Sequence, residues 1–146
     1  CGGDVPIDGG MGPRSVKAAV DHRWPDTSAA SGVSFVRSRF RLADIRDGSS
    51  NTLLAGEKYV TTGMLDLGDD QTMYVGDDAD TRRWAHAPPL HDAWQQPDPH
   101  RFGSSHPSVC NVVLCDGAVK ALPYTIDTAS FKALGNRHDG RGFVIE

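Results

Sequence analysis

The clearest alternation of apolar and polar positions lies near the C-terminal end, where the chain reads VCNVVLCDGAVKAL. The apolar run stops at Asp116-Gly117 and then resumes, which predicts a β-hairpin with strands at 111–115 and 118–122. Asp-Gly supplies the two positive-φ positions of a type I′ turn, so we expect Cys115 to lie opposite Ala118.

Hydrophobic patterning predicts three further elements. Residues 33–36 are typical of a short strand, and residues 52–60 of a longer one. Both faces of the longer strand carry apolar side chains, which indicates burial on both sides. Asp127 is placed to cap a short helix at 128–134, and Gly135 is expected to end it in the left-handed conformation.

The remaining chain is rich in turn-forming residues, with 16 Gly and 9 Pro among 146 residues. We therefore expect one globular domain, 1–146, with an irregular excursion over the first 31 residues and a long acidic and aromatic loop at 61–98. That loop is not expected to contribute to the core. No apolar run approaches the roughly 18 residues of a membrane span, and the basic residues are dispersed among acidic ones, which argues against a nucleic-acid partner.

Aspartates concentrate within the predicted loop. Carboxylate oxygens are the ligands that Ca²⁺ prefers, so a calcium site is one hypothesis. The alternative is that these side chains are solvated, cap turns, or pair with Arg82 and Arg83. The residues that would supply a cation are Asp69, Asp70, Asp77, Asp78 and Asp80.

The three cysteines allow a limited set of pairings. Cys110 and Cys115 lie five residues apart on one predicted strand, about 16 Å at roughly 3.3 Å per residue, so they are too distant to bond to each other. Cys1 could form a disulfide with Cys110 or with Cys115 if the opening segment packs on the hairpin. The other interpretation is that the strand cysteines are small buried apolar residues.

Three motifs occur in a fixed order along the chain. The segment ADIRDGSSNTLLAGEK contains Asp47, Gly48, Asn51 and Glu57, and the block DDQTMYVGDDADTRRW follows it. The third motif is His106, nine residues, then Asp116-Gly117. In this order they resemble the prepilin-type family of unknown function that is abundant in planctomycetes. Family members often carry Gly-Gly where this chain has Ser108-Val109.

The resemblance implies a fold, a location and a role. The expected fold is α+β and pilin-like, a mainly antiparallel sheet with long ordered loops and short helices. The chain would be the C-terminal globular part of an extracytoplasmic structural subunit, the head of a pilin- or pseudopilin-like protein in a surface filament or a secretion-type assembly. A basic leader and a hydrophobic helix would precede it, and self-association or contact with other pilin-like subunits would run through that helix. The isolated fragment is then expected to be monomeric or weakly associating.

Two other function classes are kept. One is a surface module that binds Ca²⁺, a saccharide or a protein through the acidic and aromatic loop. The other is a hydrolase that uses His106 with a nearby serine, for which the sequence lacks a G-x-S-x-G turn. Because the motifs are turns and strand pairs rather than catalytic constellations, the structural role is preferred and no catalytic residue is predicted.

Overall fold

The computed structural model describes residues 1–7, 12–72, 74 and 76–141. It contains short strands, one α-helix and two 3-10 helices, and its largest sheet is antiparallel, which supports the α+β class. In chain order the elements are η1 Leu42–Asp44, η2 Ser49–Asn51, β1 Leu53–Gly56, β2 Thr61–Thr62, β3 Leu90–His91, β4 Ala93–Trp94, β5 Gly103–Ser104, β6 Val109–Leu114, β7 Val119–Pro123 and α1 Thr128–Gly135.

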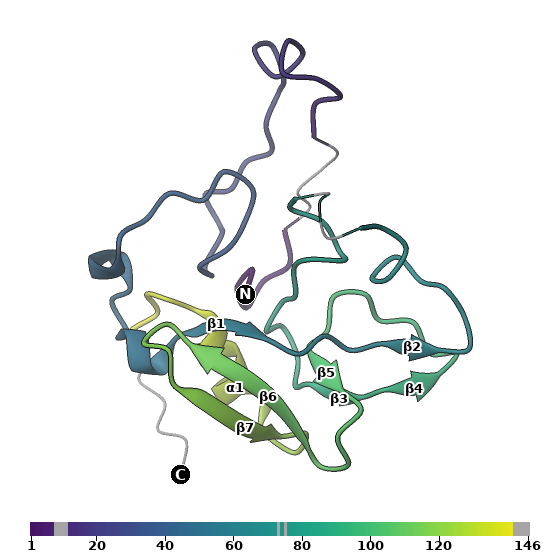
Figure 1. Cartoon of the computed structure of the whole chain (residues 1–146). Helices are drawn as coiled ribbons and strands as arrows, with labels where there is room; N and C mark the ends of the chain where they lie inside the picture. The colour runs from purple at the N-terminus through teal and green to yellow at the C-terminus, as the bar shows by residue number, and fades with distance from the viewer. Residues whose placement is uncertain (8–11, 73, 75, 142–146) are drawn as a thin grey trace.

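Strand β6 is the centre of the main sheet. It pairs antiparallel with β1 on one side and with β7 on the other, giving the order β1-β6-β7 (Figure 1). Two small parallel pairs, β2 with β4 and β3 with β5, lie beside this sheet. The extended chain that leaves β1 connects the two regions, because Lys58 bridges to Phe102 before β2 begins.

The predicted hairpin is present, but its turn differs from the prediction. Val113 pairs with Val119, and the amide of Leu114 donates to the carbonyl of Ala118 at 2.9 Å. The loop therefore has three residues instead of two. Only Gly117 has a positive φ, +89°, so the type I′ turn is wrong and the geometry fits a three-residue loop that ends in a glycine bulge.

The predicted long strand at 52–60 is interrupted early. The register shifts between Leu53 and Ala55, so Leu54 forms a bulge and its side chain is 44% exposed. Regular pairing ends at Gly56, and Leu54 and Ala55 are exposed, so burial on both faces is wrong.

The predicted strand at 33–36 does not form. The amides of Val33 and Ser34 both donate to the carbonyl of Cys1, at 3.1 and 2.9 Å, which leaves no ladder for a strand. Residues 1–7 and 12–31 contain neither helix nor strand, which confirms the predicted irregular excursion for these residues.

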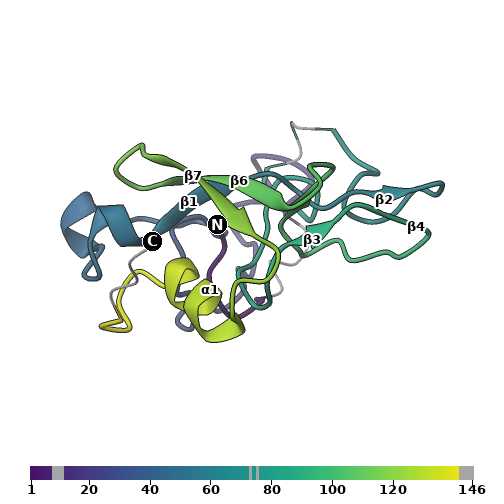
Figure 2. The same ribbon diagram turned by 90° about the horizontal axis from the view of Figure 1, so that it is seen from below.

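The core lies between the main sheet and α1. Figure 2 shows α1 on one side of the sheet and no helix on the other. Alternate residues of β6 point toward α1, and the rings of Phe102 and Phe131 meet edge to face, with 5.9 Å between ring centroids. The main core cluster consists of Cys1, Leu53, Ala85, Phe102, Cys110, Val112, Leu114, Leu122, Phe131 and Leu134.

The expectation that the 61–98 loop stays outside the core is wrong. Trp84 and Ala85 are 1% and 0% exposed. The amide of Trp84 donates to the carbonyl of His100, and the amide of Ala85 to that of Gly3. Because its backbone groups find partners on both sides, this stretch can be buried although the residues before it are acidic.

Gly135 shows a different reason for glycine at a helix end. It is the last residue of α1 and does not have a positive φ, so the predicted left-handed cap is wrong. A Cβ there would lie 2.4 Å from the Cβ of Ala85. Glycine is needed for the close approach of α1 to the 84–85 stretch. The N-cap prediction is confirmed, since the carboxylate of Asp127 accepts the amide of Ser130 at 2.9 Å.

Replacing Gly135 by alanine should destabilise the protein, although alanine normally favours a helix. We expect the free energy of unfolding to fall by about 1 to 3 kcal/mol, because the added methyl group overpacks a buried contact. Urea unfolding measures this, with Lys132→Ala on the exposed side of α1 as the matched control. A G135A protein at least as stable as the wild type would contradict the close-packing account.

Candidate functional site

Glu57 extends the pairing of β1 with β6 by means of its side chain. Its amide donates to the carbonyl of Asn111 at 3.1 Å, and its Oε2 accepts the amide of Asn111 at 2.7 Å. The carboxylate thus takes the place of a backbone carbonyl just after β1 ends. This position is fixed by the strand register, since Gly56 pairs with Val112.

The second carboxylate oxygen of Glu57 faces His106, the first residue of the third motif. Oε1 lies 3.1 Å from Nε2 of His106, and the two side chains are 36% and 49% exposed. Partial burial acts to raise the pKa of Glu57, but the hydrogen bond from Asn111 and the nearby imidazole outweigh it, so this pKa lies below its ordinary value. We call Glu57, His106 and Asn111 the carboxylate clip.

Two side-chain hydroxyls, those of Tyr124 and Ser104, hold the loop that carries His106 by hydrogen bonds to its backbone groups. The hydroxyl of Tyr124 lies 2.8 Å from the carbonyl of His106 and 3.0 Å from that of Ser104. The Oγ of Ser104 donates to the carbonyl of Val109 at 2.8 Å and accepts the amide of His106 at 3.2 Å. Ser104 is buried and makes these contacts instead of facing the imidazole, so it forms no catalytic dyad with His106.

The DGSSNT segment forms a tight turn. Gly48 has φ +92°, the side-chain amide of Asn51 donates to the carbonyl of Asp47 at 2.9 Å, and the hydroxyl of Thr52 donates to the carbonyl of Gly48 at 3.0 Å. The carboxylate of Asp47 accepts the amides of Asp139 and Gly140, at 2.8 and 2.9 Å.

This turn also packs on the tip of the β6–β7 hairpin. The amide of Cys115 donates to the carbonyl of Thr52 at 2.8 Å, and the amide of Asp116 donates to the carbonyl of Ser49 at 3.1 Å. The Oδ1 of Asp116 accepts the amide of Ala118, which shapes the hairpin loop itself. Asp47, Gly48 and Asn51 therefore meet Asp116 and Gly117 at one end of the sheet, while Glu57 and His106 meet near the other end of β6.

The acidic residues proposed as calcium ligands do not converge. Within the described residues, no three His, Cys, Asp or Glu side chains gather as a metal site. Asp69 pairs with Lys58 at 2.6 Å, Asp77 pairs with Arg82, and Asp80 accepts the amide of Gln71 at 3.1 Å. The histidines at 86, 91, 100 and 106 form no such cluster either.

The two arginines after the acidic segment have different roles. Arg82 pairs with Asp77, as predicted, and its guanidinium lies 4.5 Å above the ring centroid of Trp84. Arg83 is buried, and it donates to the carbonyls of Ala79, Arg82 and Gly68 instead of to a carboxylate. Burial lowers the pKa of the Arg83 guanidinium. Arg83 therefore orders the loop by linking its carbonyl groups.

The three cysteines are free thiols in the structure. Cys1 and Cys110 are buried, and Cys115 lies in the hairpin loop instead of on the strand. Burial, together with the nearby charge of Glu57, raises the pKa of Cys110 to about 12. The disulfide of Cys1 with Cys110 or Cys115, one of the two interpretations of the sequence, is not formed in this structure, and Cys110 packs as a small apolar core residue.

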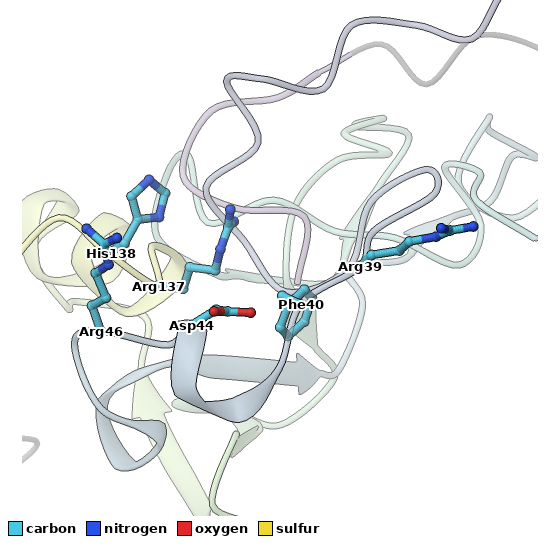
Figure 3. Close-up of a pocket in the computed structure, with 6 residues that line it drawn as sticks. All are labelled: Arg39, Phe40, Asp44, Arg46, Arg137 and His138. Carbon is cyan, nitrogen blue, oxygen red and sulfur yellow. The ribbon is translucent and has the colours of Figure 1, made fainter.

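A hollow of about 280 Å³ lies beside the segment that follows α1. Arg137 donates to the carbonyls of Ala30 and Gly32, at 2.7 and 2.6 Å, so its guanidinium serves the fold. In Figure 3, Asp44 lies in the middle of the hollow and Arg39 points away from the other side chains. The lining is Arg39, Phe40, Asp44, Arg46, Arg137 and His138. The hollow therefore presents a mixed-charge surface without converging catalytic groups.

The fold and these contacts define an α+β domain whose motif residues hold strands and loops together. Residues 10–129 match the family model described as "Protein of unknown function (DUF1559)". Because the match covers most of the chain, the protein belongs to this family. A search of curated proteins and a search of solved structures found no match. No helix in the described part of the chain is long and apolar enough to cross a membrane.

Sequence reasoning missed three residues on which the site depends. Asn111 contributes only its backbone, which no motif could reveal. Tyr124 carries the hydroxyl that holds the His106 loop, and a tyrosine just after an apolar strand gives no signal of that contact. Arg137 lies in the LGNRHDG segment, and its proximity to a predicted helix end was the one available hint.

Replacing Glu57 by glutamine should remove a pH-dependent part of the stability. Gln keeps an acceptor for the amide of Asn111 but loses the charge. A carboxyl whose pKa is lowered by folding stabilises the protein above its unfolded pKa, and this stabilisation is lost as the pH falls through the folded pKa. We expect E57Q to cost about 1 kcal/mol or less at pH 7, with the difference vanishing at low pH.

Urea unfolding of both proteins from pH 7 down to about pH 2 checks this. Asp21→Asn, which removes an exposed carboxylate elsewhere, is the control for net charge. A difference between wild type and E57Q that does not change with pH would contradict the charged role of the clip.

The thiols give a second prediction. In the folded protein at pH 7.5, iodoacetamide should modify Cys110 at least about a hundredfold more slowly than in urea, because its thiol is buried and its pKa is raised. Mass spectrometry of protein unfolded without reductant should show three alkylated cysteines. A disulfide-linked peptide containing Cys1 would contradict the free-thiol state.

Proposed function

We propose that this domain is the surface-facing head of a pilin- or pseudopilin-like structural subunit, and that it is exported to the cell envelope or beyond. In this proposal an apolar helix preceding the domain anchors it and drives assembly with other subunits. The resemblance of the three ordered motifs to the prepilin-type family suggests the role. The observation that carries it here is the open face of the main sheet.

The open face is the side of the sheet away from α1, formed by Ala55, Asn111, Val113, Val119 and Ala121. Val113 pairs directly with both Ala55 and Val119, so these apolar side chains form one continuous strip across three strands. Val119 is 71% exposed, and a shallow hollow of about 350 Å³ lies over the strip. Small apolar side chains on a flat sheet suit the packing of an apolar helix.

The roles of the motif residues also support a structural protein. Asp47, Glu57 and Asp116 each accept backbone amides from another segment or from their own turn. A catalytic carboxylate would instead need to face a cavity and a reacting group. The carboxylates of these residues stabilise the backbone conformation of the domain, as expected if the head is a rigid structural unit.

The proposal is tested on the native full-length protein in its own cells. Immunogold electron microscopy with antibodies against this domain should label surface filaments or envelope-bound assemblies. Label confined to the cytoplasm would contradict the proposal.

A matched pair of variants tests the open face. Val113→Asp together with Val119→Asp should abolish assembly of the full-length protein, because two charges would be buried under the helix. The control is Leu42→Asp. Leu42 is also apolar and is 74% exposed, but it lies outside the sheet, so this variant should assemble normally. Circular dichroism of each variant domain checks that the fold is kept. Normal assembly of the V113D/V119D protein would rule out helix packing on this face.

A further inference from the structure

Exposed apolar side chains gather in a second place, just after β2. Leu65 and Leu67 are 71% and 68% exposed, and Met64 is 46% exposed. Together with two prolines they line a hollow of about 370 Å³. We call this surface the acidic groove; its lining is Met64, Leu65, Asp66, Leu67, Asp70, Pro97 and Pro99.

The rim of this groove keeps an excess of negative charge. Asp70 makes no ion pair with any described residue, and neither does Asp78 or Asp80. Desolvation, the charge and hydrogen bond of Asp80, and the charge of Asp78 raise the pKa of Asp70. The buried Arg83 lies near Asp66 and Asp80, but the carboxylates outnumber it. An apolar floor beside this excess of carboxylates favours an occupant that is apolar and basic.

A segment near the N-terminus of the chain has these properties. Residues 14–23, which we call the basic tip, project away from the sheet at the top of Figure 1. One helical turn forms there, since the amide of Ala19 donates to the carbonyl of Ser15 at 3.1 Å. Val16 lies in this turn and Val20 directly follows it; the two valines are 91% and 82% exposed, and we call them the apolar ridge.

Basic residues flank these two valines in the sequence. The basic residues of the tip, Arg14, Lys17 and Arg23, are exposed and make no ion pair with a described residue. The tip contains one acidic residue, Asp21, so its net charge is positive. Ridge and groove thus match in both respects: valines against leucines and prolines, and ammonium or guanidinium groups against carboxylates. The two surfaces belong to different parts of the chain, and no hydrogen bond or ion pair between described residues joins them.

We propose that the basic tip of one copy docks into the acidic groove of the next. The contact is heterologous, because each partner contributes a different surface, so repetition produces open chains or rings instead of a symmetric dimer. Both surfaces are small, and weak encounters are found among interfaces below about 1,200 Å², so we expect the isolated domain to associate with a dissociation constant on the order of 0.1 to 1 mM.

This contact deepens the assembly role proposed above and takes its biological meaning from it. It would add a lateral or axial contact between heads to the packing of helices. The two can fail separately, because the experiment uses the 146-residue chain, in whose described residues no helix is long and apolar enough to span a membrane. A failure here leaves the helix-driven assembly intact, and a failure of envelope labelling leaves this contact measurable.

The test is sedimentation velocity of the chain from about 10 µM to 1 mM at low and at high salt. The mean mass should rise with concentration beyond that of a dimer, and high salt should weaken the association by about tenfold, because exposed charges are screened. Lys17→Glu on the tip and Asp70→Lys in the groove should each weaken it by about fivefold.

Charge exchange provides the decisive arm. The double variant K17E/D70K should associate within about twofold of the wild type, because each contact again joins opposite charges. An equimolar mixture of K17E and D70K should associate more strongly than either variant alone. Lys132→Glu, which makes the same charge change on the exposed side of α1, should have no effect.

Three outcomes would overturn the proposal. The chain could stay monomeric up to 1 mM, it could form a closed dimer that the tip and groove variants leave unchanged, or K17E/D70K could fail to recover association. Because Lys17 and Asp70 are exposed and make no ion pair with described residues, thermal unfolding of the variants should match the wild type, which separates lost association from lost folding.

Discussion

The pairing of β6 with a neighbour on each side is the constraint on which this structure depends. Its inward residues, Cys110, Val112 and Leu114, are nearly inaccessible and supply the centre of the core beneath α1. Its two ends receive the motif contacts, the carboxylate clip at Asn111 and the DGSSNT turn at Cys115 and Asp116. A domain with so little regular structure needs such fixed points, because the entropy of ordering long loops opposes folding.

The motif carboxylates therefore accept backbone amides at places where a strand or helix has ended. Where β1 stops, Glu57 replaces a backbone carbonyl; where the chain turns after α1, Asp47 accepts two amides that have no strand partner. Glu57 satisfies a partly buried amide that would cost about 1 to 3 kcal/mol if it were left unpaired, whereas the amides that Asp47 accepts are exposed. This leaves the outer surfaces, the open sheet face and the acidic groove with its complementary tip, free for contacts between molecules.

The sequence was informative wherever a local rule sufficed. The hairpin followed from an apolar run around Asp-Gly, and the cap of α1 followed from Asp127. Non-local packing decided what was missed. Leu54 bulges and Gly135 is small because of contacts with distant segments, and Trp84 is buried because the opening segment pairs with the stretch around it. For the site, the motifs named Glu57 and His106 separately, but their contact across 49 residues, and the part played by the backbone of Asn111, required the fold.

Native-state amide hydrogen exchange tests the central claim, that motif carboxylates act as partners of the backbone. The amides of Asn111, Asp139 and Gly140 donate to a motif carboxylate, Glu57 or Asp47, from a distant segment of the chain. At neutral pH the account predicts protection of the Asn111 amide equal to that of the β6 ladder, and clear protection of the other two relative to the amides of residues 14–23. Exchange of all three at the rate of an unstructured peptide, with the β6 ladder still protected, would contradict it.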